Sequence, residues 1–151
     1  MRVHEDVVAV CKQRLRVQGA EFGSTTSRPR RRGWFDLVAM KYSIMINGIT
    51  KLGITKLDVL TGFDEIRVCT EYRVNGKPLK YFPTDVGTLS SIEPVYETFP
   101  GWDEDITAAR SFDDLPANAK SYLNALREMT GVEIQHISVG PKRAQTIELT
   151  H

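Results

Sequence analysis

The sequence predicts an α/β fold, and three observations lead to this prediction. Residues 34–47 and 115–129 have the length and apolar content of helices. Short runs at 53–60, 66–72 and 132–139 are rich in β-branched and other apolar residues, as strands are. Polar residues follow the first and last of these runs, and ligands of open α/β sheets usually bind at the carboxyl ends of strands.

The composition is that of one globular domain. The chain has 151 residues, of which 41% are hydrophobic and 26% charged. Its net charge of +1 hides an asymmetry, because residues 1–32 contain 8 Lys and Arg but 3 Asp and Glu. Two cysteines make no disulfide framework, and no run resembles a membrane span or a secretory signal. We therefore expect a cytoplasmic protein that does not contact a membrane.

After a lead-in at 1–18 with a weak helical stripe, a loop at 19–33 combines hydroxyl groups with arginines. Hydroxyl and loop N–H groups bind carboxylates and phosphates, and arginine grips the same anions bidentately. The loop therefore suits a small anionic substrate. A solvated charged loop is an alternative. A nucleic-acid-binding patch ranks lower, because no aromatic residue alternates with the arginines and the rest of the chain is acidic.

The helix predicted at 34–47 is apolar on more than one side, so we expect it to be buried. Gly48 is a plausible stop. Because the helix follows the arginine loop directly, its amino terminus could stabilise an anion held there.

The run at 53–60 reads as a short buried strand that ends in a polar tip. Thr55, Lys56 and Asp58 interrupt its apolar residues, which a core strand would not favour. An Asp carboxylate can accept hydrogen bonds from the ring N–H and the exocyclic amino group of guanine, a donor pair that adenine lacks. The stem of Lys56 could cover the purine face. On these residues alone, the favoured interpretation is a strand end whose charges are merely solvated.

The middle of the chain predicts a strand at 66–72 and a hairpin turn at Asn75-Gly76, which would pair this strand with residues 77–82. Residues 83–91 read as a loop, 94–99 as an extended segment, 100–102 as a turn and 103–114 as irregular.

The second helix, at 115–129, would be capped by Asp113 or Asp114 and end at Gly131. A strand follows at 132–139, and 146–149 could form a last strand. If the strand at 132–139 neighbours the first one, its polar loop meets Lys56 and Asp58 at one edge of the sheet.

A complete active site is not recognisable from spacing. The histidines His4, His136 and His151 are scattered, and His136 reads as structural. No cluster has metal-ligand spacing, and no phosphate-loop motif is present.

Four motifs occur together in order. They are residues 21–31 with Gly33-Trp34, residues 55–60, Glu93 to Glu97 with Pro100-Gly101-Trp102, and Ser138-Val139-Gly140-Pro141. Together they resemble adenylosuccinate synthetase along roughly residues 17–148, nearly the whole chain. The resemblance divides the chain into a poorly matching lead-in at 1–16 and, at 17–151, a C-terminal part of the family's domain.

The resemblance implies a ligase of purine biosynthesis that uses GTP and magnesium to join IMP and L-aspartate. It implies an α/β fold with a large central sheet, related to phosphate-loop nucleotide-binding proteins, and a homodimer. The aspartate and IMP site would comprise Ser24, Thr25, Thr26, Ser27, Arg28, Pro29 and Arg30. The GTP site would comprise Arg30, Lys56, Leu57, Asp58, Ser138, Val139 and Gly140. The family loop usually has Gly where this chain has Ser27.

The resemblance places the catalytic residues and magnesium ligands in an amino-terminal part of the family that this chain does not contain. We therefore expect that the isolated chain is inactive and marginally stable, with exposed sheet edges and apolar helix faces. The alternative function is that of a catalytically inactive remnant that at most binds guanine nucleotide.

Overall fold

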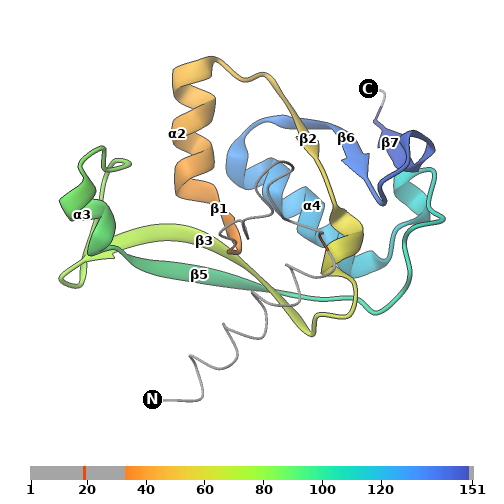
Figure 1. Ribbon diagram of the computed structural model, residues 1–151, viewed down its shortest axis with the longest axis horizontal. Coiled ribbons are helices and arrows are strands. Elements are labelled where there is room, and N and C mark those ends of the chain that lie inside the picture. Colours follow the sequence, from red (N-terminus) through yellow and green to blue (C-terminus); the bar gives the residue numbers. More distant parts are fainter. Residues whose placement is uncertain (1–18, 20–32, 150–151) are drawn as a thin grey trace, which may run out of the picture. The chain divides into compact units, whose positions relative to one another are not determined.

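The computed structural model describes Gly19 and residues 33–149. The chain divides into two compact units, residues 1–33 and 34–151, and the second unit is described below by itself. The predicted lead-in at 1–18 lies outside the described residues, as does almost all of the arginine loop. Strands and helices in the second unit confirm the predicted α/β class (Figure 1).

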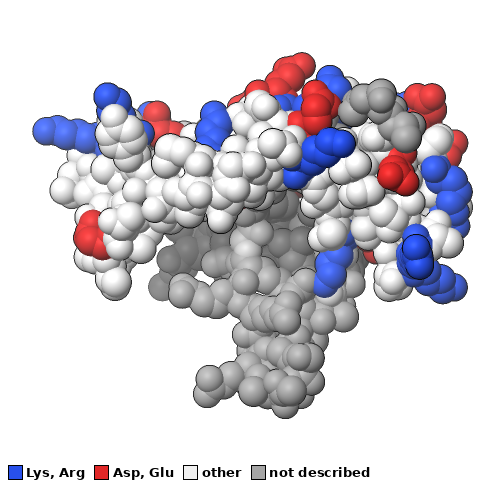
Figure 2. Space-filling view, turned by 90° about the horizontal axis from the view of Figure 1, so that it is seen from above, with Lys and Arg blue, Asp and Glu red and all other residues white. Residues whose placement is uncertain are grey.

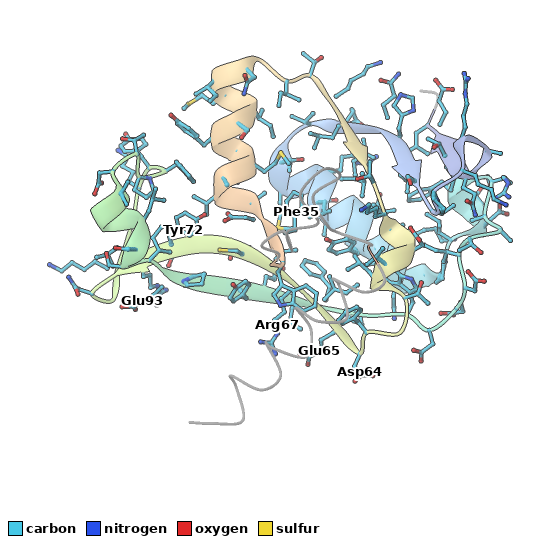
Figure 3. All side chains as sticks on the ribbon, in the orientation of Figure 1. Phe35, Asp64, Glu65, Arg67, Tyr72 and Glu93 are labelled. Atoms are coloured by element: carbon cyan, nitrogen blue, oxygen red, sulfur yellow. The ribbon has the colours of Figure 1, made fainter. Side chains whose placement is uncertain are left out.

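The first sheet is built around one long strand. Its members are β1 (Phe35–Asp36), β3 (Glu65–Val74), β4 (Lys77–Pro78) and β5 (Glu93–Pro100). β3 pairs parallel with β1 and antiparallel with β4 and β5. β3 and β5 form a long ribbon, and Figure 3 shows Tyr72 and Glu93 toward one end of it, with Asp64 and Glu65 at the other. Both strands were predicted, and each extends a few residues further than expected.

The predicted hairpin at Asn75-Gly76 is confirmed. Both residues have positive φ, 53° and 73°, as a two-residue turn of type I′ requires. β4 is shorter than the predicted 77–82, since its paired residues end at Pro78. The prediction of a plain loop at 83–91 was wrong, because α3 (Val86–Ser90) forms there. This single turn of helix begins where the Thr88 N–H donates to the Asp85 carboxylate at 2.7 Å.

The first predicted helix is α2 (Leu37–Asn47), which begins three residues later than expected. Asp36 caps it by accepting the Ala39 N–H at 3.0 Å, and Gly48 ends it in the left-handed conformation, as predicted. The expectation of a buried helix was wrong. Of its residues only Leu37 is fully buried, and Met45 and Ile46 remain 71% and 58% exposed.

The second sheet contains the strand from which the candidate site starts. It comprises β2 (Lys51–Ile54), β6 (Glu133–Ser138) and β7 (Thr146–Glu148). β2 and β6 run parallel, and β7 is antiparallel to β6. The carboxyl ends of β2 and β6 therefore meet at one edge, which confirms that the strand at 132–139 neighbours the first one.

The second predicted helix is α4 (Ala117–Thr130), which ends at left-handed Gly131 as expected. The predicted cap was wrong, because Pro116 precedes the helix without a side-chain cap. Asp114 instead forms a capping box with Ser111 around the short 3-10 helix η2 (Phe112–Asp114). Tyr122, Leu123 and Leu126 on the apolar face of α4 are buried in the core.

The surface of the second unit mixes charges of both signs. Figure 2 shows Lys and Arg lying among Asp and Glu on one face, between broad uncharged areas. Over the part of the chain that the structure describes, no helix combines the length and apolarity that a bilayer crossing requires.

Candidate functional site

The chain turns sharply after β2, and this turn corrects the prediction for 53–60. The strand ends at Ile54, and Leu57–Leu60 form a 3-10 helix, η1, instead of a continuation of the strand. Lys56 adopts the left-handed conformation, with φ 61° and ψ 39°, which an L residue rarely adopts and which ends the extended chain. The Lys56 carbonyl then accepts the Val59 N–H at 3.2 Å, so local bonds replace those of a sheet.

η1 places Asp58 between two core residues. The side chains of Leu57 and Val59 are 1% and 8% exposed, so they pack in the core and anchor η1 there. The Oδ1 atom of Asp58 is buried and has no hydrogen-bond partner among the described residues. A buried acceptor without a donor costs roughly 1–3 kcal/mol. A ligand with N–H donors would remove this cost, and guanine has two such donors on one edge.

The turn after β6 leaves the sheet beside η1. Ile54 pairs with Ile137, and η1 contacts β6, so the polar residues after both strands lie at the same sheet edge. Ser138 Oγ donates to the Gly140 carbonyl at 3.1 Å, which closes a compact turn. Val139 is fully buried, and its N–H donates to the Gln145 carbonyl at 2.9 Å.

Gly140 is held close to the 3-10 helix η3 (Arg143–Gln145). A Cβ atom at position 140 would lie 2.5 Å from the Gln145 side chain, so a larger residue would displace that side chain. The Gln145 amide is itself fixed, since its Nε2 donates to the Thr107 carbonyl at 3.1 Å. The 138–140 turn is therefore a built part of the fold rather than a solvated loop.

The structure thus brings together one of the two predicted groups of site residues. Lys56, Leu57 and Asp58 lie at the same edge as Ser138, Val139 and Gly140. The predicted anion loop lies outside the described residues, namely Ser24, Thr25, Thr26, Ser27, Arg28, Pro29 and Arg30.

The sequence predicted Pro100-Gly101-Trp102 as a turn and as part of a family motif, without connecting it with this site. In the structure the Gly62 N–H donates to the Trp102 carbonyl at 2.7 Å, immediately after η1. The signal that could have found this contact is a buried-type aromatic residue, Trp102, directly after a glycine.

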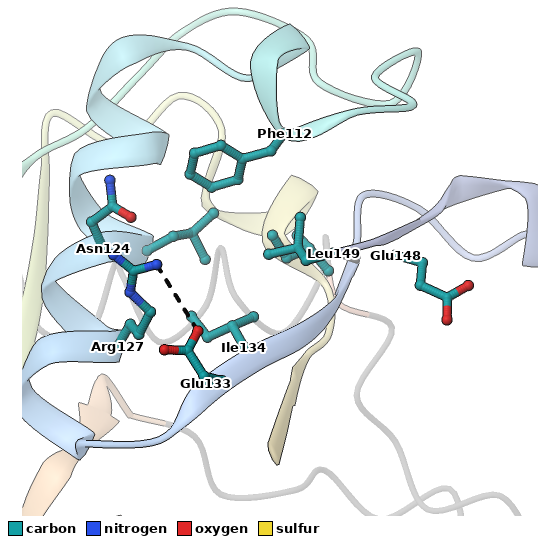
Figure 4. A pocket seen from close by; sticks show the side chains of 9 residues that line it. Phe112, Asn124, Arg127, Glu133, Ile134, Glu148 and Leu149 are labelled. Carbon is teal, nitrogen blue, oxygen red and sulfur yellow. Dashed lines mark ion pairs between the residues drawn. The ribbon is translucent and has the colours of Figure 1, made fainter. Parts of the chain in front are cut away.

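A hollow of about 270 Å³ lies elsewhere, between α4 and β6 (Figure 4). Arg127 and Glu133 form an ion pair of 4.0 Å across it. The residues that line it are Phe112, Leu123, Asn124, Arg127, Glu133, Ile134, Ile137, Glu148 and Leu149. They include none of the predicted site residues, so this hollow is not the candidate nucleotide site.

Within the described ranges, no group of three or more His, Cys, Asp or Glu side chains could hold a metal ion. His136 is exposed on β6.

Comparison with known proteins gives the family. The model of the adenylosuccinate synthetase family matches residues 4–147. The chain belongs to the adenylosuccinate synthetase family. It is 55% identical over 135 residues to the adenylosuccinate synthetase of Moorella thermoacetica and 56% identical over 135 residues to that of Carboxydothermus hydrogenoformans. These alignments cover 89% of this chain and 32% of each relative.

The fold agrees with that of a solved family member. The structure of fully ligated adenylosuccinate synthetase from Plasmodium falciparum superposes with a TM-score of 0.89 at 41% identity. The match covers 92% of this chain and 34% of that one. The chain thus spans about a third of the length of the synthetases it matches.

Proposed function

We propose that this chain provides the guanine- and aspartate-binding parts of an adenylosuccinate synthetase. That enzyme joins IMP and L-aspartate to give adenylosuccinate, with GTP converted to GDP and phosphate. Membership of the family supports the proposed reaction. The sheet edge formed by η1 and the 138–140 turn supports the proposed guanine binding.

The observation that carries the proposal is the buried Oδ1 of Asp58, which has no partner in the described part of the chain. In the proposed complex the two carboxylate oxygens accept the ring N–H and the exocyclic amino group of guanine. The Lys56 side chain covers one face of the base, and Ser138 to Gly140 close the other side. Adenine has an acceptor where guanine has the ring N–H, so the same carboxylate repels it.

The aspartate part of the proposal rests on the sequence of the arginine loop. Ser24 to Ser27 would donate hydroxyl and backbone hydrogen bonds to the carboxylates of L-aspartate. Arg28 would add a bidentate contact and reach the IMP side, and Arg30 would reach GTP.

Catalysis requires more than the described residues hold. Magnesium would neutralise negative charge on the phosphates of GTP, but the described residues offer no group of His, Cys, Asp or Glu side chains that could hold it. We propose that magnesium and the reacting groups are held by the remaining two-thirds of the family fold, in a cytoplasmic homodimer. Alone, this chain then binds guanine nucleotide without turning it over.

The direct experiment is calorimetric titration of the 151-residue chain with GDP and, separately, with ADP. We expect GDP to bind and ADP to bind at least about tenfold more weakly, since charged hydrogen bonds contribute roughly 1.5–3 kcal/mol each. Asp58→Asn should remove the preference, because an amide presents one acceptor where two are needed.

Asp64→Asn is the matched control, because Asp64 is exposed and lies outside η1. It should leave both affinities unchanged. Equal affinity of the wild-type chain for GDP and ADP, or an Asp58→Asn chain that still prefers GDP, would contradict the proposal.

The aspartate loop needs the complete fold. A chimera in which this chain replaces the matching third of the Moorella thermoacetica synthetase should form adenylosuccinate when GTP is supplied. In that chimera, Arg28→Leu should raise KM for L-aspartate more than KM for GTP. Equal increases would argue against a specific role for Arg28 at the aspartate carboxylates.

A further inference from the structure

The turn at 100–102 is hydrogen-bonded to three of the four residues that follow η1. The Gly62 N–H donates to the Trp102 carbonyl at 2.7 Å, and the Gly101 N–H donates to the Asp64 carbonyl at 2.9 Å. The indole Nε1–H of Trp102 donates to Thr61 Oγ1 at 3.2 Å. These bonds fix residues 61–64 from one side.

Gly101 makes this approach possible. A Cβ atom at position 101 would lie 1.5 Å from the Phe63 carbonyl oxygen. No side chain can occupy that space, so the two backbones meet only because residue 101 is glycine. The sequence motif Pro100-Gly101-Trp102 thus has a structural reason that a simple turn does not require.

The same turn is anchored to α4 on its other side. Asn118 Nδ2 in the first turn of α4 donates to the Gly101 carbonyl at 2.6 Å. The ring of Trp102 lies 6.3 Å from the ring of Tyr122, and both side chains are 4% exposed. Trp102 therefore connects the buried face of α4 with the end of η1.

Thr61 connects this support with the proposed guanine-binding carboxylate. Its N–H donates to the Asp58 carbonyl at 3.1 Å, while its hydroxyl accepts the indole N–H of Trp102. We infer that Thr61 and Trp102 are positioning residues, which hold the Asp58 carboxylate so that it accepts both guanine donors at once. The inference rests on the proposed function, because it assigns the residues that give that site its selectivity.

Loss of this positioning should affect one hydrogen bond in particular, the one from the exocyclic amino group of guanine. If η1 can tilt, the Asp58 carboxylate can keep one hydrogen bond to the base while the second departs from a favourable angle and distance. Inosine diphosphate lacks the exocyclic amino group and makes only the first. Loss of positioning should therefore reduce the preference for GDP over inosine diphosphate more than it reduces binding as such.

The test compares Thr61→Val with Thr61→Ser in the full 151-residue chain, with calorimetric affinities for GDP and inosine diphosphate. Valine removes the acceptor, and serine retains it. We expect Thr61→Val and Trp102→Phe to lower the GDP preference about threefold or more, and Thr61→Ser to retain it. Thr98→Val, on the exposed side of β5, controls for the same chemical change elsewhere and should have no effect.

A merely structural role would lower Tm in Thr61→Val while leaving the GDP preference unchanged, and that result would overturn the inference. If the wild-type chain fails to discriminate GDP from ADP, the proposed function fails instead. In that case, amide hydrogen exchange in the nucleotide-free chain tests whether Thr61 and Trp102 hold η1 in place. Thr61→Val should speed exchange of the Val59 amide relative to the amides of α4, and unchanged exchange at Val59 would overturn the inference.

Discussion

The two ends of the β3–β5 ribbon are held in different ways. At the η1 end, Trp102 and Leu57 are almost fully buried, and Gly101 packs directly against the Phe63 backbone. At the α3 end, Val86 and Tyr81 are 80% and 73% exposed, and no residue of α3 is buried. The η1 end is fixed by the core, whereas the short helix α3 is held by local hydrogen bonds.

The difference shows where this fold concentrates its rigidity. The Asp58 carboxylate, which we propose binds guanine, lies in η1. Because η1 contacts β6 and is linked to α4 through Trp102, its position is determined by long-range packing. The helix α3 itself buries none of its residues and is determined locally, chiefly by the Asp85 cap. Equivalent substitutions at the two ends should therefore have very different effects.

The largest contrast is expected between two glycine-to-alanine substitutions. Gly101→Ala should lower the free energy of unfolding by about 3 kcal/mol or more, because the new methyl group overlaps the Phe63 carbonyl. Gly87→Ala lies within α3, where the nearest atom would be 3.4 Å away, and alanine favours helix. It should be neutral or slightly stabilising. Urea unfolding of both variants makes the comparison, and similar losses would show that the ends do not differ.

A second contrast uses leucine. Leu57→Ala in η1 removes a side chain that is 1% exposed and should cost about 2–5 kcal/mol. Leu89→Ala in α3 removes one that is 40% exposed and should cost less than about 1 kcal/mol. The measurement is thermal unfolding of each variant with the wild-type chain as reference. A large loss for Leu89→Ala would mean that α3 contributes to the core.

The smallest effect concerns pH. The Thr88 backbone N–H and hydroxyl donate to the Asp85 carboxylate and lower its pKa below the usual value of 3.8. Because the pKa is lowered, the cap stabilises α3 fully at pH values above the pKa of Asp85 in the unfolded chain. This stabilisation is lost as the pH falls through the pKa of Asp85 in the folded chain. NMR signals of residues 86–90 should therefore move toward coil values only in strong acid, while η1 signals persist at that stage.

Asp85→Asn is the control for this titration, because asparagine also caps helices but does not ionise. Signals of 86–90 that shift with acid in the Asn variant as they do in the wild-type chain would assign the change to another group.

Much of this architecture could be predicted from the sequence. The strands at 66–72 and 132–139 and the helix at 115–129 carry strong local patterns, and Asn75-Gly76 fixes its own turn through positive φ. The sequence left open whether the strands at 53–60 and 132–139 are neighbours, and the structure pairs β2 with β6. The predicted group around Asp58 and Ser138 lies at one sheet edge for this reason.

The errors have a common physical origin in context that local patterns do not contain. Leu57 and Val59 alternate as strand residues do, yet the left-handed Lys56 turns them into a 3-10 helix whose buried side is set by β6 and the core. α2 has the apolar content of a buried helix, but no partner in the second unit covers Met45 and Ile46 among the described residues. The support from Trp102 depends on a contact between residues 41 positions apart, which no local pattern reveals.

Guanine recognition at η1 is tested most directly by an NMR titration of the ¹⁵N-labelled chain with GDP. We expect amide shifts to change at residues 56–61 and 138–140 together, while residues 85–91 at the opposite end of the ribbon stay unchanged. Shift changes confined to the hollow between α4 and β6, or spread equally over both ends, would contradict guanine recognition at η1.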